Sequence, residues 1–263
     1  MLLFLKLGGS LITQKNQPYT ARRETIRRLA HEIAAARTAQ PHLQLLIGHG
    51  SGSYGHTAAY KHGTRSGVQN AEGWQGFVEV WRQARALNQI MVEALLEAGL
   101  PVIAFPPSAS VVTDGGSVLR WELEPLTAAL GAGLTPLVQG DTVFDRQRGG
   151  TILSTEELFE YLSSRLKPQR VLIAGQEQGV WADYPRCQRL LETLTPSDMT
   201  SASGTVFASS VVDVTGGMAE KVACMLRLVT QNPALEALIF SGEEPGTVQH
   251  VLMGGCSGTR IHA

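Results

Sequence analysis

The chain has 263 residues, of which 43% are hydrophobic and 17% charged, and its formal net charge is −1. This length and composition predict one large α/β domain or two small ones with a sizeable core, and they disfavour long disordered segments. A net charge near zero supplies no global basic field for nucleic acid, so any anion must be held by locally placed groups. No apolar run reaches the ~20 residues that a membrane-spanning helix needs. Residues 1–6 lack the basic region and the cleavage site of a signal peptide.

The three cysteines, Cys187, Cys224 and Cys256, are far apart in the sequence, and no CxxC pair occurs. This pattern is typical of free thiols in a reducing compartment and offers no disulfide framework or zinc site. We therefore expect a cytoplasmic protein.

Hydrophobic periodicity divides the first part of the chain into alternating strands and helices. The expected strands are residues 2–7, 43–47, 101–105 and 135–139, and the expected helices are residues 21–38, 73–98 and 122–130. Thr20 is the expected N-cap of the first helix, and Gly99 is expected to end the second. Residues 57–72 are polar and are expected to form a surface loop or a mobile lid.

Turn signals and a capping motif mark the middle of the chain. Asp114-Gly115-Gly116 and Gly149-Gly150 each predict a β-hairpin. Ser154-Thr155-Glu156-Glu157 fits a capping box that opens a helix reaching about Leu166.

The remaining predicted elements lie in the C-terminal part. They are strands at 170–174, 211–214, 235–240 and 248–253, an irregular polar stretch at 193–207 and a helix at about 218–230. Alternating strands and helices predict an α/β fold with an open, mostly parallel sheet and helices on both faces, to which the hairpins add antiparallel strands at an edge. We expect a single domain over residues 1–263, with a soft division near residues 167–170.

The most informative stretch is the glycine-rich segment 48–56, which follows a predicted buried strand and ends at His56. Closely spaced glycines allow a sharp turn whose free N–H groups form an anion-binding concavity. A lone glycine-rich loop is equally often an ordinary surface loop. Two further glycine pairs, Gly8-Gly9 and Gly216-Gly217, adjoin a predicted strand and a predicted helix, and the carboxyl ends of parallel strands can bring all three together in one crevice.

The glycine motifs exclude one common nucleotide-binding class and disfavour another. The sequence contains no GxxxxGK[ST], so it does not encode a P-loop NTPase. The letters of residues 50–55 match GxGxxG, but this match follows the second strand and lacks the context of a dinucleotide site.

Taken in order, these motifs resemble those of the amino acid kinase superfamily. The resemblance rests on Lys6 to Ser10 with Lys15, on residues 48–56, on Gly140-Asp141, and on Asp213 to Met218 with Lys221. The motifs extend over nearly the whole chain. A second-strand segment ending in Gly-His is similar to that of the isopentenyl phosphate kinases in particular.

The resemblance implies a kinase that joins ATP to isopentenyl phosphate, with Mg²⁺ carried on the ATP phosphates. The catalytic side chains would be Lys6, Lys15, His56 and Lys221, of which Lys15 stabilises the transferring phosphoryl group and His56 binds the acceptor phosphate. ATP would contact Lys6, Gly8, Gly9, Ser51, Asp183, Gly216, Gly217 and Lys221. The acceptor would contact Gly50, Gly55, His56, Gly140 and Asp141. The N-terminal half, about 1–167, would bind the acceptor, and the C-terminal half, about 168–263, would bind ATP.

Elementary chemistry is consistent with these roles. Transfer between two anions needs positioning and cations on the oxygens that gain charge, and an ionised acceptor phosphate needs no general base. A strand-end lysine such as Lys6 is often only a surface charge. Lys221, however, lies in the first turn of its predicted helix, where a cation is unfavourable unless an anion binds there.

The chain departs from the family pattern at two places. Members commonly carry a Ser-Gly-Asp-Asp-like segment where this chain has residues 154–157, and Glu156 is the expected replacement for the acid that organises the lysines. Members also often have acids where this chain has Gln176-Glu177-Gln178, which implies a possible difference in nucleotide use.

The helix expected at 73–98 carries more apolar bulk than one core-facing stripe requires. We therefore expect Val78, Trp81 and Leu87 to line a pocket for the prenyl tail. Two alternatives remain open: a kinase of the same fold for another small phosphate or phosphonate, such as fosfomycin, and a non-catalytic nucleotide-binding protein. We also expect a homodimer, with no nucleic-acid or membrane partner.

Overall fold

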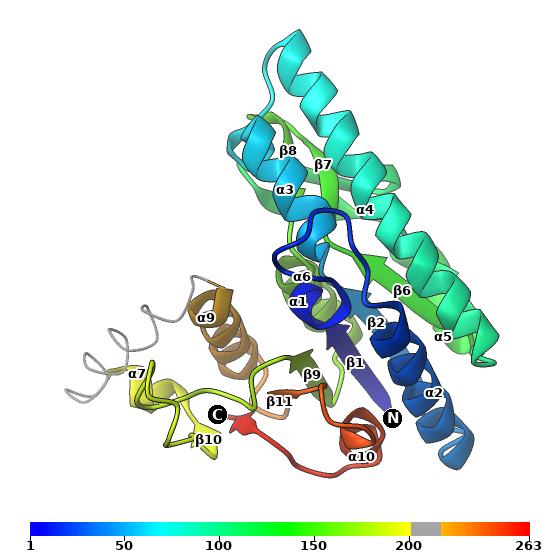
Figure 1. The fold of residues 1–263 in the computed structure, drawn as a ribbon, viewed down its shortest axis with the longest axis vertical. Coiled ribbons are helices and arrows are strands. Elements are labelled where there is room, and N and C mark those ends of the chain that lie inside the picture. Colours follow the sequence, from blue (N-terminus) through cyan, green and yellow to red (C-terminus); the bar gives the residue numbers. More distant parts are fainter. Residues whose placement is uncertain (201–216) are drawn as a thin grey trace.

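The computed structural model describes residues 1–200 and 217–263 (Figure 1). Its centre is an eight-stranded sheet in the order β10-β12-β11-β9-β1-β2-β6-β3. The strands are β1 (Leu2–Leu7), β2 (Gln44–His49), β3 (Val102–Ala104), β6 (Thr135–Gln139), β9 (Arg170–Gly175), β10 (Thr193–Leu194), β11 (Glu236–Ser241) and β12 (Thr259–Ile261). Neighbouring strands are parallel except for the β11–β12 pair. The prediction of an open, mostly parallel α/β sheet is confirmed.

Helices cover both faces of this sheet. Successive side chains of a strand point to opposite faces, so the position of a residue in its strand determines which helices it contacts. Leu3, Leu5 and Leu7 of β1 belong to the core under α2 (Arg23–Ala39), α4 (Ala71–Glu97) and α10 (Thr247–Leu252). Phe4 points to the opposite core, under α5 (Glu124–Gly131), α6 (Thr155–Leu166) and α9 (Gly217–Gln231). Because Lys6 shares the parity of Phe4, its side chain lies on the α6 and α9 side.

A second sheet of four strands lies beside α4, in the order β5-β4-β7-β8 (Figure 1). Its strands are β4 (Val111–Asp114), β5 (Ser117–Trp121), β7 (Asp141–Asp145) and β8 (Gly149–Leu153). Both predicted hairpins are present, but they build this separate sheet instead of extending an edge of the large one. The carboxylate of Asp145 stabilises both turns, since it accepts N–H bonds from Gly115, Gly116, Gln147 and Arg148.

The most important difference from the predictions concerns the glycine-rich segment, which is mainly helical. The turn is confined to Gly50 and Ser51, and α3 (Gly52–His62) begins directly after it and is followed by the short helix η1 (Thr64–Ser66). The expected loop over 57–72 is therefore wrong. Four glycines concealed the helix, because glycine has low intrinsic helix propensity.

Three smaller predictions were also wrong. A strand was expected at 248–253, but residues 247–252 form α10, because Val248, Val251 and Leu252 are buried at helical spacing. Thr20 does not cap α2, whose N-cap residue is Arg22. The stretch at 193–207 starts with β10 and α7 (Pro196–Thr200).

The remaining predicted helices and strands agree with the structure to within a few residues. The short helices α1 (Gly9–Ile12) and η2 (Pro107–Ala109) complete the described elements. The predicted strand at 211–214 and the Thr215-Gly216 turn lie outside the described residues. Within residues 1–200 and 217–263, no helix is long and apolar enough to cross a membrane.

Candidate active site

The candidate site lies where the chain order of the sheet reverses. From β1 the chain runs to β2 on one side and later returns to β9 on the other. Such a reversal opens a crevice at the carboxyl ends of the strands. The turn after β1 is held there by the Gly8 N–H, which donates to Ala174 O of β9 at 2.8 Å.

The turns after β1 and β2 touch each other through their backbones. A Cβ atom at Gly9 would lie 2.5 Å from the nitrogen of Gly52, and Gly52 itself has a left-handed φ of +49°. Only glycine fits both conditions without displacement. The two glycine segments picked out from the sequence therefore form one continuous backbone surface at the edge of the crevice.

A cluster of two lysines and one glutamate lies on the α6 and α9 side of this crevice. Lys6 forms an ion pair with Glu156, in the first turn of α6, and both side chains are largely enclosed. Lys221 of α9 is close enough for its charge to contribute to lowering the pKa of Glu156, although Lys6 has the larger charge effect. The pKa of Lys221 is itself lowered, first by burial and then by Lys6, while Glu156 and Glu177 oppose that shift. Glu156, the residue expected to organise the lysines, thus pairs with Lys6 and lies within range of the Lys221 charge.

Lys15 reaches the same crevice from the loop between α1 and α2. A cavity of about 100 Å³ is lined by Ser10, Lys15, Ile173, Gly175, Gln176, Glu177, Gly217, Met218, Lys221 and Ile239. Its lining combines two lysines, one glutamate and the backbone that follows β9. The cavity therefore suits a polyanionic ligand.

His56 is located in the second turn of α3, with an exposed side chain. It nevertheless lies deep enough in the crevice for loss of hydration to lower its pKa. The positive charges of Lys6 and Arg65 act in the same direction, and Glu156 opposes them. In the unliganded protein His56 is thus held toward its neutral form, which still carries one N–H donor.

Gly50, Ser51 and Gly55 lie at the start of α3, Gly140 lies between β6 and β7, and Asp141 is the first residue of β7. Gly140 is joined to β2, since its N–H donates to His49 O at 3.2 Å. The Asp141 carboxylate is buried, accepts N–H bonds from Thr142 and Ser108, and has its pKa raised by burial to about 6. Asp141 thereby links η2 to β7 at the border of the predicted acceptor site.

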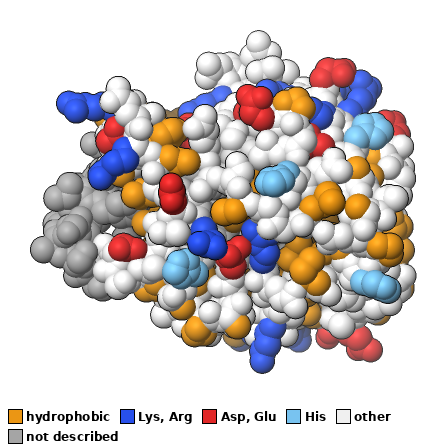
Figure 2. All heavy atoms as spheres, turned by 90° about the horizontal axis from the view of Figure 1, so that it is seen from below, with side chains coloured by type: hydrophobic (Ala, Val, Ile, Leu, Met, Phe, Trp, Pro, Cys, Tyr) orange, Lys and Arg blue, Asp and Glu red, His pale blue; other side chains and the backbone are white. Residues whose placement is uncertain are grey.

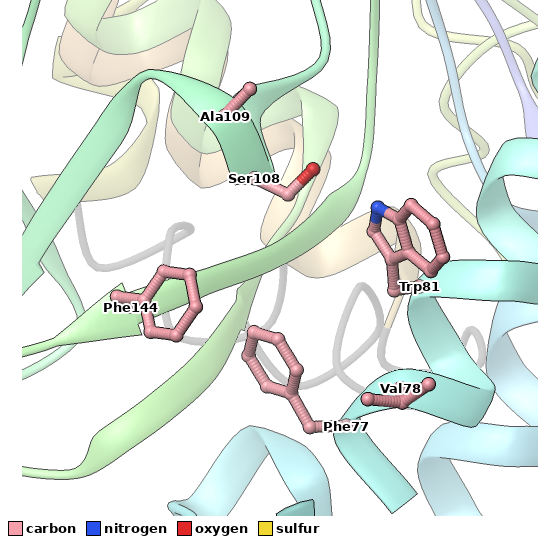
Figure 3. A pocket seen from close by; sticks show the side chains of 6 residues that line it. All are labelled: Phe77, Val78, Trp81, Ser108, Ala109 and Phe144. Carbon is pink, nitrogen blue, oxygen red and sulfur yellow. The ribbon is translucent and has the colours of Figure 1, made fainter.

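An apolar pocket of about 270 Å³ opens between α4 and the small sheet (Figure 3). Phe77, Val78 and Trp81 of α4 line one wall, and Ser108, Ala109 and Phe144 line the other. The rings of Phe77 and Phe144 lie 5.4 Å apart. Val78 and Trp81, which were expected to line a tail pocket, both line this one, and the binding of a prenyl tail here stays a prediction. Leu87 does not line it: two turns further along α4, its side chain is fully buried in the core against the large sheet.

Two predicted nucleotide contacts are less clearly placed. Asp183 accepts N–H bonds from Gln188 and Arg189 and so shapes its own loop, and it does not line the cavity beside Lys15. Gly216 lies outside the described residues, whereas Gly217 lines that cavity.

Sequence reasoning missed three polar residues around the crevice. His49 and Asn88 are buried and hydrogen-bonded to each other at 3.0 Å, and Arg65 donates to Glu157 and to Ile152 O. A signal for Asn88 was present, because it interrupts the apolar stripe of α4 at a core-facing position. Arg65 had no comparable signal, since its place follows from the tertiary contact between η1 and β8.

On the molecular face drawn in Figure 2, acidic and basic side chains are interspersed. Together with the net charge of −1, this mixture indicates that anion binding depends on the local lysine cluster and not on a broad basic surface.

Comparisons with known proteins identify the family. The model of the "Amino acid kinase family" matches residues 1–241. The isopentenyl phosphate kinase of Methanothermobacter thermautotrophicus is 32% identical over 272 residues, covering 99% of this chain and 98% of the relative. That of Methanocaldococcus jannaschii is 30% identical over 270 residues, covering 99% and 98%. A solved structure of isopentenyl phosphate kinase matches with a TM-score of 0.84 at 29% identity, covering 99% of this chain and 100% of the other.

Proposed function

Since the chain belongs to the amino acid kinase family and, within it, to the isopentenyl phosphate kinases, we propose that it transfers the terminal phosphoryl group of ATP to isopentenyl phosphate. The products are isopentenyl diphosphate and ADP. The observation that carries this proposal is the lysine cluster around Glu156, beside two touching glycine turns and a separate apolar pocket.

The reaction requires cations and positioning. An oxygen of the acceptor phosphate forms a bond to the γ-phosphorus of ATP while the bond to the β,γ-bridging oxygen breaks. Charge develops on the transferring group and on the leaving ADP. Lys6 and Lys221 neutralise the ATP phosphates, and Lys15 stabilises the phosphoryl group during its transfer. No base is needed, because the acceptor oxygen is already ionised.

The acceptor phosphate is held by His56 and by the N-terminus of α3. The free N–H groups and the helix dipole at such a terminus favour an anion. This subsite is bordered by Gly50, Gly55, Gly140 and Asp141. Acceptor binding is therefore assigned to residues 1–167. The neutral His56 side chain contributes a hydrogen bond without adding a further cation beside Lys6.

ATP occupies the cavity beside Lys15 and Lys221. Gly8 and Gly9 supply backbone at the phosphate end, Ser51 lies where the ATP and acceptor phosphates meet, and Gly216 and Gly217 precede Lys221. The segment from Gly179 to Asp183 lies along the bound nucleotide. ATP binding is therefore assigned mainly to residues 168–263.

Mg²⁺ enters as the complex with ATP. The charged lining of the cavity consists of Lys15, Lys221 and Glu177, which suits a metal held chiefly by phosphate oxygens and water. When bound, the metal neutralises charge on the phosphate oxygens, and this chain's lysines position those oxygens.

The pocket of Phe77, Val78, Trp81 and Phe144 accommodates the five-carbon tail. An apolar pocket with few polar groups is typical of a site that binds a hydrocarbon chain. The pocket has a volume of only about 270 Å³, so short prenyl phosphates are the preferred acceptors.

Assembly and location complete the proposal. We expect a homodimer, and the exposed Ile103 on the edge strand β3 is one apolar group that dimerisation could cover. The three free thiols fit a reducing cytoplasm. Light scattering of the purified protein tests the assembly.

An acceptor screen tests the function. ATP turnover is measured with isopentenyl phosphate, dimethylallyl phosphate, fosfomycin and small amino acids. Isopentenyl phosphate should give the highest kcat/KM. A higher value with fosfomycin would favour the phosphonate kinase alternative, and no turnover with any acceptor, despite ATP binding, would favour a non-catalytic role.

A further inference from the structure

His49 is a fully buried histidine at the end of β2 to which the proposed reaction assigns no role. It has the parity of Leu45 and Ile47, so its ring points toward α4, where Asn88 meets it. Its backbone oxygen accepts hydrogen bonds from the Thr155 hydroxyl at 2.7 Å and from the Gly140 N–H at 3.2 Å. The residue therefore lies between the α3 turn, α4, α6 and the β6–β7 connection.

The ring hydrogen bonds of His49 define one tautomer. Asn88 Nδ2 lies 3.0 Å from His49 Nε2, and since an amide nitrogen only donates, Nε2 must accept. The proton of the neutral ring is therefore on Nδ1, which lies 3.1 Å from Gly50 O and donates to it. Burial keeps the ring neutral, because it lowers the pKa of His49 to about 4.

This tautomer fixes the direction of one peptide group at the proposed acceptor site. In a trans peptide the C=O and the following N–H point in opposite directions. Since the Gly50 carbonyl is held toward the His49 ring, the Ser51 N–H points away from it. In the described part of the chain, neither the Ser51 N–H nor the Gly52 N–H has an acceptor within the protein.

We propose that Asn88 is a positioning residue for acceptor binding: it holds His49 in the Nδ1–H tautomer, which aims the Ser51 N–H at the acceptor phosphate. The inference rests on the proposed function for the identity of the acceptor, but the tautomer itself does not. The effect should fall mainly on the acceptor, because no described hydrogen bond or ion pair joins His49 or Asn88 to the lysines around the ATP cavity.

The variant Asn88→Asp tests the proposal by reversing the requirement at Nε2. A carboxylate only accepts, so Nε2 must then carry a proton. In the variant, a protonated His49 ring can donate from both nitrogens and keeps its hydrogen bond to Gly50 O. A neutral ring, with its proton on Nε2, has a lone pair on Nδ1 and loses that bond. Lys6 of β1 lies on the opposite face of the sheet, and its positive charge disfavours the imidazolium of His49.

The expected result is a new pH dependence of acceptor binding. At pH 6.5 the KM of Asn88→Asp for isopentenyl phosphate should be close to that of the parent. By pH 9 it should rise by on the order of tenfold, as expected when a hydrogen bond to a charged group is lost. The KM for ATP should change less than about twofold at either pH, because the lost hydrogen bond is made to the acceptor phosphate. Gln89→Glu, at the exposed neighbouring position, is the matched charge control and should show no such dependence.

The ¹⁵N chemical shifts of His49 in the parent protein test the tautomer without turnover, and they should show a neutral Nδ1–H ring from pH 6 to 9. A ring protonated on Nε2, or a pH-independent acceptor KM in folded Asn88→Asp, would overturn the proposal. If the parent does not phosphorylate isopentenyl phosphate but its ring is Nδ1–H, the proposed function has failed and the tautomer assignment stands.

Discussion

Lys6 at the end of β1 is paired with Glu156 at the start of α6, and only 6% and 14% of their side-chain surfaces are exposed. The pair joins the two elements that border the phosphate crevice, and Lys221 lies within range of both charges. Two buried cations without a counter-ion would repel each other. Glu156 supplies negative charge that offsets this repulsion.

The first prediction is that Glu156→Gln will be less stable and unusually responsive to ATP. Removing one partner of a buried pair leaves an uncompensated charge, which costs about 3 kcal/mol. ATP phosphates can replace the lost carboxylate, so saturating ATP should raise the Tm of the variant more than that of the parent. Thermal unfolding with and without ATP measures this, and Glu160→Gln, on the same helix, is the control.

The pH dependence of the same variant has a definite sign. Lys6 and Lys221 lower the pKa of Glu156, so its stabilisation is present above the ordinary value of 4.5 and is lost as the pH falls through the lower folded value. The difference in the free energy of unfolding between the parent and Glu156→Gln should therefore become smaller as the pH is lowered from 7 to 3. A constant difference between pH 7 and pH 3 would show that the ion pair does not stabilise the fold.

The second prediction concerns His56, which should act as a neutral donor. His56→Ala should lose most of its kcat/KM for isopentenyl phosphate with little change in the KM for ATP, whereas His56→Gln should retain part of the activity because it keeps an N–H donor.

The pH profile separates a neutral donor from a cation. The pKa of His56 is lowered from its ordinary 6.5, so raising the pH above 7 removes no charge from the free enzyme. The kcat/KM profiles of the parent and of His56→Gln should therefore have the same shape between pH 7 and 9. A loss in the parent alone would mean that the imidazolium is the active form.

The third prediction is that Lys15→Ala will lower kcat strongly and leave the KM for both substrates almost unchanged. This pattern is expected for an interaction that strengthens in the transition state. Arg27→Ala, an exposed change in α2, is the control. A change in KM alone would restrict Lys15 to binding ground-state phosphate.

Residue types and their order in the sequence led to the charged groups of the crevice, whose roles stay predictions, but not to the local structure around them. Lys6, Lys15, Glu156 and Lys221 were recognised by their residue types and order, and those properties do not depend on where each element begins. The start of α3 was missed because its glycines allow close backbone packing, and in a sequence such closely spaced glycines look the same as those of a loop. His49 and Asn88 were missed because their role depends on a contact between β2 and α4.

The fourth prediction exploits the structural difference between Trp81 and Leu87, which the sequence placed in one pocket. Trp81 lines the pocket between α4 and β7, so Trp81→Ala should lengthen it and improve ten- and fifteen-carbon prenyl phosphates relative to isopentenyl phosphate. Each additional buried CH₂ group contributes about 0.8 kcal/mol at most.

Leu87→Ala is the matched control, since Leu87 is fully buried in the core. It should cost roughly 2–5 kcal/mol of stability without changing the order of substrate preference. An unchanged order in folded Trp81→Ala, or a changed order in Leu87→Ala, would place the tail elsewhere.

The most direct test of the central claim is to follow the reaction of ATP and isopentenyl phosphate by ³¹P NMR. The account predicts that the monophosphate resonance is replaced by the two coupled resonances of a diphosphate ester, with one ADP formed for each, and that Lys15→Ala slows both changes equally. Release of inorganic phosphate from ATP while the isopentenyl phosphate resonance stays unchanged would contradict it.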